Sequence, residues 1–260
     1  RVPVGHAAFS IDKEKQSMNI VLLSGGSGKR LWPLSNDIRS KQFIKIFKNA
    51  DGSHNSMLQR VYEQIKSVDS EAKITIATSK GQVSSICNQL ADNVSISVEP
   101  CRRDTFPAIA LAACYLHDVL HVPANEAVVV SPIDPYVDDS YFAAFEKLAA
   151  LAQQPENNLV LMGIEPTYPS EKYGYVIPDG KEAISTVSMF KEKPDAKTAE
   201  EYIKKGALWN GGVFAFKLQY LLAKAHELIE FDDYYDLYNK YDTLTKISFD
   251  YAVVEKEPRI

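Results

Sequence analysis

The sequence has 260 residues, of which 29 are lysine or arginine and 34 are aspartate or glutamate, so its net charge is −5 with neutral histidines. This acidic balance argues against a nucleic-acid-binding protein, because such a protein would carry a basic stripe. No apolar run approaches the roughly 20 residues of a membrane-spanning helix, so we expect no membrane partner. The apolar content of 45% and the charged content of 24% are ordinary for a globular protein with a large core.

The amino-terminal segment 1–17 has neither the apolar core of a signal peptide nor a clear periodicity. We interpret it as an added tag or a flexible arm and exclude it from the fold, and the length of the rest of the chain allows one domain or two. The three cysteines, Cys87, Cys101 and Cys114, lack C-x-x-C spacing. Their spacing favours a reducing cytoplasm over a setting that forms disulfides.

A glycine-rich loop follows the first predicted strand, an apolar run over 19–23. It reads SGGSGKR at 24–30. Its three glycines let the backbone bring N–H groups close to a ligand, and its two cations add the fixed positive charge that suits a polyphosphate. A Walker A loop is excluded because Leu23 and Arg30 occupy two of its required positions, and a dinucleotide fingerprint would end on Leu31. The loop therefore predicts a nucleoside triphosphate as ligand.

Predicted helices and strands alternate after this loop. They are a helix over 57–68, a strand over 73–77, a helix over 82–91, a strand over 94–98, a helix over 108–119, a strand over 126–130, a helix over 141–152 and a strand over 158–163. Alternation of this kind predicts right-handed βαβ units with parallel strands.

Asp134 lies just beyond the apolar run 128–130, where the ligands of open parallel sheets bind. A carboxylate in this place, in a chain with a triphosphate loop, is a natural Mg²⁺ ligand. A cap for the turn before the next helix is an equally good interpretation of the same residue. Asp138 and Asp139 are expected to start that helix, since carboxylates stabilise helix N-termini.

The second half changes character, with short strands and a Gly-rich turn. The predicted strands are 175–178, 186–191 and 212–216, and the predicted helices are 195–204, 218–229 and 232–241. We therefore expect an α/β fold in which helices flank a Rossmann-like mixed, mostly parallel sheet. Its first half is predicted to bind the nucleotide and its second half to hold another ligand against it.

Several motifs together resemble the sugar-1-phosphate nucleotidyltransferases. The loop continues as GGSGKRLWPLS at 25–35 with KQF at 41–43, which looks most like the mannose-1-phosphate guanylyltransferases. Further matching motifs follow in the family's order: EP at 99–100, RDT at 103–105, SPID at 131–134, YGY at 173–175, FKEKP at 190–194, WNGGVF at 209–214 and ISFDYAVVEK at 247–256. The resemblance runs from about Met18 to the end, so it implies one nucleotidyltransferase (GT-A-like) catalytic domain over 18–260.

The resemblance implies a reaction in which GTP and mannose 1-phosphate give GDP-mannose and pyrophosphate, with Mg²⁺ as cofactor. Arg30, Lys41 and Lys193 would offset phosphate charge in catalysis, and Asp134 and Asp250 would hold the metal. The residues implied in nucleotide binding are Leu23, Gly25, Gly26, Ser27, Gly28, Lys29, Glu99, Arg103 and Thr105, and those implied in sugar phosphate binding are Gly174, Glu192, Lys193 and Asn210. The sequence leaves open whether the chain forms a homodimer.

Several positions depart from the family pattern. They are Ser40, Asp104, Phe106, Pro135 and Gly211, where the family has proline, asparagine, alanine, histidine and serine. Asp104 adds negative charge near the expected nucleotide. A W-x-D-x-G segment and a C-terminal extension that follow in the family do not occur in the 260 residues, so we expect the catalytic domain without that extension.

Two other functions fit the same motifs. One is the same chemistry with another pair of substrates, such as UTP and glucose 1-phosphate. The other is a non-catalytic regulator that binds a nucleotide sugar, although such a binder has no need of Asp134, Lys193 and Asp250 together. A kinase-type phosphotransferase is excluded because the Walker and kinase motifs are missing.

Overall fold

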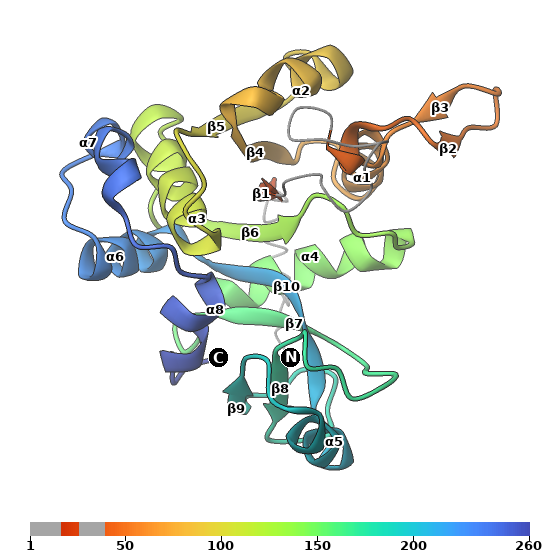
Figure 1. Ribbon diagram of the computed structural model, residues 1–260, viewed down its shortest axis with the longest axis vertical. Helices are drawn as coiled ribbons and strands as arrows, with labels where there is room; N and C mark the ends of the chain where they lie inside the picture. The colour runs from red at the N-terminus through yellow and green to blue at the C-terminus, as the bar shows by residue number, and fades with distance from the viewer. Residues whose placement is uncertain (1–16, 26–39) are drawn as a thin grey trace, which may run out of the picture.

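The computed structural model describes residues 17–25 and 40–260. Within them, an eight-stranded sheet has the order β5-β4-β1-β6-β10-β8-β9, with β7 paired to β10 (Figure 1). Its strands are β1 (Asn19–Ser24), β4 (Lys73–Ser79), β5 (Ser95–Glu99), β6 (Ala127–Pro132), β7 (Val160–Ile164), β8 (Tyr175–Pro178), β9 (Val187–Lys191) and β10 (Leu208–Lys217). The predicted tag or arm at 1–17 lies outside the described residues except for Ser17.

The direction of the strands divides the sheet at β6. Strands β5, β4, β1 and β6 run parallel, whereas β10 is antiparallel to β6, β7 and β8, and β9 is antiparallel to β8. The predicted α/β fold with a mixed sheet is confirmed. Its parallel part comes from the alternating first half of the chain, and its antiparallel part comes from the second half.

Strand β1 explains why a continuous apolar run marks the centre of the sheet. Ile20 and Leu22 belong to the core on one face, and Val21 belongs to the core on the other. Because successive side chains of a strand point to opposite faces, a strand covered on both faces reads as a continuous apolar run through its middle. The amino end of β1 is further fixed by a hydrogen bond from the Met18 backbone N–H to Asp69 Oδ2, at 2.9 Å.

Helices cover both faces of the sheet (Figure 1). On one face lie α1 (Met57–Val68), α2 (Val83–Leu90) and α4 (Asp139–Ala152), and on the other lie α3 (Thr105–Cys114), α6 (Leu218–Leu228) and α8 (Phe249–Ala252). Helix α7 (Tyr234–Lys240) packs outside α3 and α6, and α5 (Ala196–Lys204) packs against β8. Within 17–25 and 40–260, no helix has both the length and the apolar character needed to cross a bilayer.

Local signals explain where the helices begin. Helix α1 has the predicted bounds because Ser56 and Gln59 form a capping box at its start. The predicted helix over 108–119 begins earlier, as α3, since Asp104 caps it by accepting from the backbone N–H of Thr105 at 2.7 Å. Asp138 caps α4 as expected, accepting from the backbone N–H of Ser140. The early start of α3 matters because its first turn faces the carboxyl ends of the parallel strands.

Two differences from the sequence prediction follow from short or irregular elements. Strand β10 starts at Leu208, four residues before the predicted strand, because two glycines made its first part resemble a turn. The structure instead has a register shift between Asn210 and Phe214, with Gly212 at a φ of +68°. A small sheet of β2 (Phe47–Lys48) and β3 (His54–Asn55) was not predicted, since strands of two residues carry no periodicity.

Candidate active site

A cavity of about 340 Å³ lies at the carboxyl ends of the parallel strands. This edge of an open α/β sheet is where ligands bind. The cavity is lined by Leu23, Gly25, Ala77, Glu99, Arg102, Asp104, Thr105, Ala108, Pro132 and Asp134. It thus contains four of the predicted nucleotide-binding residues and one predicted metal ligand. The predicted residues Gly26, Ser27, Gly28, Lys29 and Arg30 lie outside the described part of the chain.

Glu99 presents a buried carboxylate to this cavity. It is the last residue of β5 and only 7% exposed. The Tyr241 hydroxyl donates a hydrogen bond of 2.6 Å to its Oε2 atom. Burial raises the pKa of Glu99 above its ordinary value, while the Tyr241 hydrogen bond and the charge of Arg102 oppose that rise. A carboxylate held in this way is an acceptor for N–H groups of a ligand.

The first turn of α3 joins the cavity to α8. The Thr105 hydroxyl oxygen accepts from the backbone N–H of Phe249 at 2.8 Å, and the backbone N–H of Phe106 donates to the Ile247 carbonyl at 3.1 Å. Arg103, which was predicted to bind the nucleotide, does not line the cavity, whereas Arg102 does. Within the described residues, the buried Nε atom of Arg103 has no hydrogen-bond partner, and its role stays a prediction.

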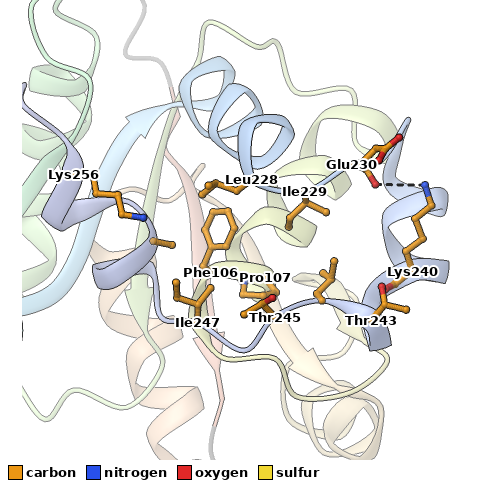
Figure 2. Close-up of a pocket in the computed structure, with 12 residues that line it drawn as sticks. Phe106, Pro107, Leu228, Ile229, Glu230, Lys240, Thr243, Thr245, Ile247 and Lys256 are labelled. Atoms are coloured by element: carbon orange, nitrogen blue, oxygen red, sulfur yellow. Dashed lines mark hydrogen bonds between the residues drawn. The ribbon is translucent and has the colours of Figure 1, made fainter.

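A second cavity, of about 430 Å³, lies behind this turn, where Phe106 and Pro107 face α6 and the segment 240–247 (Figure 2). Its walls are mostly apolar, with Lys240 held at its edge by the Glu230 carbonyl oxygen at 3.4 Å. None of the predicted site residues that the structure describes lines it. We therefore interpret this cavity as a packing gap behind the site, between α3, α6 and the segment 240–247.

Lys41 and Asp134, both predicted site residues, form an ion pair between Nζ and Oδ2. Lys41 opens a 3₁₀ turn, Lys41–Phe43, that a buried polar network holds to the end of β1. At its centre, Gln82 donates to the Ser40 hydroxyl at 2.8 Å and accepts from the Ser24 hydroxyl at 2.9 Å. Sequence reasoning missed Gln82, because a glutamine at a predicted helix start gives no sign of a long-range role.

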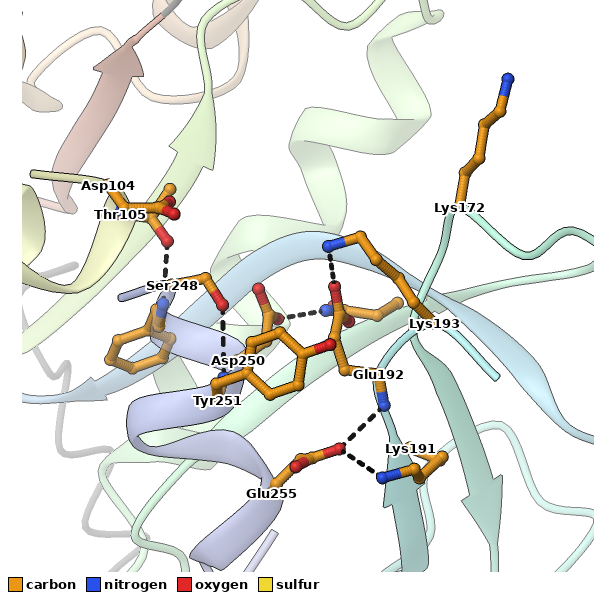
Figure 3. A network of polar contacts seen from close by, with 12 residues as sticks. Asp104, Thr105, Lys172, Lys191, Glu192, Lys193, Ser248, Asp250, Tyr251 and Glu255 are labelled. Atoms are coloured by element: carbon orange, nitrogen blue, oxygen red, sulfur yellow. Dashed lines mark hydrogen bonds and ion pairs between the residues drawn. The ribbon is translucent and has the colours of Figure 1, made fainter. Parts of the chain in front are cut away.

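The second group of predicted residues gathers around α8 and the end of β9 (Figure 3). Asn210 Nδ2 donates to Asp250 Oδ1 at 2.6 Å, and Lys193 Nζ pairs with Glu192 Oε1 at 2.5 Å. The backbone N–H of Asn210 also donates to the Gly174 carbonyl at 2.8 Å. All the residues predicted to contact the sugar phosphate therefore lie in one cluster.

Glu255 fixes the strand end that carries Glu192 and was not predicted as a site residue. Its Oε1 atom accepts from the backbone N–H of Glu192 at 3.0 Å and pairs with Lys191 Nζ at 3.3 Å (Figure 3). Its position inside the motif at 247–256 was the available signal. Lys193, which follows Glu192 in the chain, has a φ of +45°. The backbone therefore turns sharply at this member of the cluster.

The cluster carries more negative charge than its lysine neutralises. Burial, followed by the charge of Glu192, raises the pKa of Asp250 from 3.8 to about 6, against the opposing effects of the Asn210 hydrogen bond and Lys193. The hydrogen bond to Glu192 in turn raises the pKa of Lys193. An excess of buried carboxylate next to a lysine is an environment suited to a further cation.

The cavity and the cluster lie at the same edge of the sheet. The backbone N–H of Gly212 donates to Asn210 Oδ1 at 3.0 Å. A Cβ atom on Gly212 would lie 3.6 Å from Cγ of Pro132, which lines the cavity. The bond between Phe249 and Thr105 makes a second connection. The site therefore has two adjoining halves, one at the parallel strand ends and one between β9, β10 and α8.

A family model described as Nucleotidyl transferase matches residues 19–248. The chain belongs to the nucleotidyl transferase family. The match covers the parallel strand ends and strands β9 and β10, and it ends just before α8, so Asp250 lies beyond it. The family resemblance inferred from the motifs is confirmed, and so is the expected fold.

Individual relatives of this nucleotidyl transferase agree with the family match. The alginate biosynthesis protein AlgA of Pseudomonas fluorescens is 33% identical over 92% of this chain and 53% of its own length. A mannose-1-phosphate guanylyltransferase of Escherichia coli is 35% identical over 76% of this chain and 44% of its own. The chain thus spans about half the length of these relatives. A crystal structure described as mannose-1-phosphate geranyltransferase from Thermus thermophilus matches with a TM-score of 0.75 and 31% identity, over 94% of this chain and 72% of that one.

Proposed function

We propose that the chain is the catalytic domain of a sugar-1-phosphate nucleotidyltransferase that joins GTP and mannose 1-phosphate into GDP-mannose and pyrophosphate. The observation that carries the proposal is the junction of the two halves of the site. The cavity with Glu99 and Asp134 suits a nucleotide, and the adjoining cluster with Asn210 and Lys193 suits a phosphorylated sugar. Their contact at Gly212 and Pro132 would set the two phosphates side by side.

The chemistry follows from this placement. An oxygen of the sugar phosphate attacks the α-phosphorus of the nucleotide, a new P–O bond forms, and the bond to the departing pyrophosphate breaks. Phosphate oxygens are already anionic near neutral pH, so no side chain needs to remove a proton. The protein has to align two polyanions and offset their charge, for which Lys41 and Lys193 stand in the two halves of the site.

The residues present fit Mg²⁺ by their chemistry, and we propose that Asp134 and Asp250 hold it. Among the described residues no three His, Cys, Asp or Glu side chains gather into a metal-binding group. Mg²⁺ requires only one or two protein carboxylates when phosphate oxygens supply other ligands. Burial and, after it, the charge of Glu192 raise the pKa of Asp250, and a bound cation would offset both effects. When bound, the metal would polarise the phosphate oxygens and fix their alignment.

Glu99 supports guanine as the base. A carboxylate accepts hydrogen bonds and donates none when ionised. Guanine offers two neighbouring donors, N1–H and N2–H, whereas uracil offers one N–H between two carbonyl acceptors and adenine places an acceptor beside its amino group. The E. coli relative named mannose-1-phosphate guanylyltransferase supports the same choice of nucleotide and sugar.

The test is the release of pyrophosphate by the purified chain with Mg²⁺, mannose 1-phosphate and each of GTP, UTP, ATP and dTTP. Release with GTP alone is expected. Release of pyrophosphate with UTP and glucose 1-phosphate, but not with GTP, would support the same reaction with a different pair of substrates. Binding of GTP without release from any nucleotide would contradict catalysis and favour a nucleotide-sugar-binding regulator.

Replacing Gly174 by alanine should weaken binding of mannose 1-phosphate. The new Cβ atom would lie 2.5 Å from Glu192 Oε2 and 2.9 Å from Cζ of Phe190. Since Glu192 is buried, it has to shift, at a cost of about 1–3 kcal/mol in stability. We expect the KM for mannose 1-phosphate to rise about tenfold, measured from initial rates. Gly180→Ala is the matched control, because its Cβ would meet no atom closer than 3.9 Å. An unchanged KM in Gly174→Ala would contradict the placement of the sugar phosphate.

A further inference from the structure

We propose that Tyr241 is a positioning residue for nucleotide selection, whose hydroxyl holds the Glu99 carboxylate in place to accept the N–H groups of guanine. The inference rests on the proposed function and extends it to a residue outside every recognised motif. Tyr241 touches no ligand in this scheme, since it acts from behind Glu99.

The hydrogen bond from Tyr241 occupies one oxygen of the Glu99 carboxylate and leaves the other oxygen for a ligand. Glu99 lines the cavity at the end of β5, and Tyr241 reaches it from the turn after α7, across 142 residues of sequence. The hydrogen bond of 2.6 Å engages Oε2. A carboxylate has a second oxygen, so Oε1 can accept from a base in the cavity while Oε2 is held. Fixing one oxygen removes the rotational freedom that the carboxylate would otherwise lose on binding.

The ring of Tyr241 is anchored independently of its hydroxyl. Tyr241 is fully buried, in a core that Ala110 and Leu111 of α3, Ala225 of α6 and Leu237 of α7 also form. Its turn borders the second cavity through Thr243, and the same segment continues to Ile247, which accepts from the first turn of α3 (Figure 2). Removing the hydroxyl alone therefore leaves the packing of the ring in place.

The hydroxyl also favours the ionised form of Glu99, which guanine requires. Burial and the charge of Asp104 raise the pKa of Glu99, whereas the Tyr241 hydrogen bond and Arg102 lower it. Cys101 and Arg103 are the other titratable side chains that act on the hydroxyl of Tyr241. A protonated Glu99 would present a donor to the donors of guanine. Tyr241 thus orients the acceptor and favours its ionised form against the effect of burial.

The first variant is Tyr241→Phe, studied as the whole chain. Because hydrogen bonds to charged groups are stronger than those between neutral groups, we expect the Kd for GTP, measured by calorimetry, to rise at least about tenfold. The KM for GTP should rise in parallel, with kcat and the KM for mannose 1-phosphate within about twofold of wild type. Tyr220→Phe is the matched control, since Tyr220 donates to Glu257 Oε2 at 2.7 Å in another Tyr–Glu pair that does not line the cavity. It should leave the Kd for GTP unchanged.

A double-variant cycle tests whether Tyr241 acts through Glu99. Glu99→Gln should itself weaken GTP binding, and adding Tyr241→Phe to it should weaken binding by no more than about twofold further. An unchanged Kd in Tyr241→Phe, or an equally large effect of Tyr241→Phe in the Glu99→Gln background, would overturn the inference. So would a wild-type chain that does not bind GTP.

The binding measurement separates this inference from the proposed function. If the wild-type chain binds GTP and shows the expected cycle but releases no pyrophosphate, the role of Tyr241 stands and the proposed catalysis fails. If the wild-type chain turns over GTP and Tyr241→Phe binds it normally, catalysis stands and the role of Tyr241 fails.

Discussion

Replacing Asp134 by asparagine is expected to lower the turnover number at least about 100-fold. The change keeps the shape of the side chain but removes the charge that would hold Mg²⁺ against the phosphates. Folding should be nearly unaffected, because the partner in its ion pair, Lys41, is 53% exposed and exposed pairs contribute only ~0–1 kcal/mol. The measurement is kcat with saturating GTP and mannose 1-phosphate, together with the thermal unfolding midpoint.

The matched control is Asp138→Asn, which makes the same chemical change in the same loop. Asp138 caps α4 by accepting from the backbone N–H of Ser140. Asparagine caps helices about as well as aspartate, so neither stability nor turnover should change appreciably. A near wild-type kcat in Asp134→Asn would refute the metal role of Asp134. An equal loss of kcat in both variants would indicate that the loop as a whole, and not the charge of Asp134, determines turnover.

The sequence predicted the parts of the site that local pattern determines. The apolar run of β1 indicated a buried central strand, and Asp134 followed β6 at the expected edge of the sheet. Family motifs also identified the residues that the structure brings together between β9, β10 and α8, such as Asn210 and Asp250. These motifs are short stretches of chain, and the family resemblance assigns neighbouring residues in them to the same ligand.

Contacts between distant segments could not be predicted. Gln82 supports the turn of Lys41 through a buried network, and Tyr241 reaches Glu99 across 142 residues. Each is an ordinary residue in its own segment, a glutamine at a helix start and a tyrosine in an amphipathic stretch. Their roles arise only when the sheet brings the segments together. Asn210 illustrates an intermediate case, since its motif was recognised but the register shift that follows it and its hydrogen bond to Asp250 were not.

Replacing Asp250 by asparagine is expected to abolish turnover while making the chain more stable. Burial and Glu192 raise the pKa of Asp250 from 3.8 to about 6, so the ionised form destabilises the fold at neutral pH. This cost is about 1–3 kcal/mol, because each pH unit between the two pKa values corresponds to about 1.4 kcal/mol. The amide has no charge to bury, and its oxygen can still accept from Asn210. At pH 7.5 without Mg²⁺, the unfolding midpoint of Asp250→Asn should therefore lie a few degrees above that of wild type.

The pH dependence distinguishes a buried charge from a packing effect. Between pH 3.8 and about 6, the folded wild-type chain binds more protons at Asp250 than the unfolded chain does. The contribution of Asp250 to the free energy of unfolding should therefore fall as pH rises through this window, and the advantage of Asp250→Asn over wild type should appear over the same range and disappear at lower pH. Asp236→Asn is the opposite control, since the hydrogen bond from Lys240 lowers the pKa of Asp236 and its loss should not stabilise the chain.

Mg²⁺ links this stability to function. With GTP present, Mg²⁺ should stabilise wild type more than Asp250→Asn, because only wild type offers the second carboxylate. The stability lost to the uncompensated charge of Asp250 would then be recovered when substrate and metal bind. A variant that is less stable than wild type at pH 7.5, or that retains wild-type turnover, would contradict this role. Under the proposed metal role, the negative charge around Asp250 would be a cost in the free protein that prepares one half of the site for a cation.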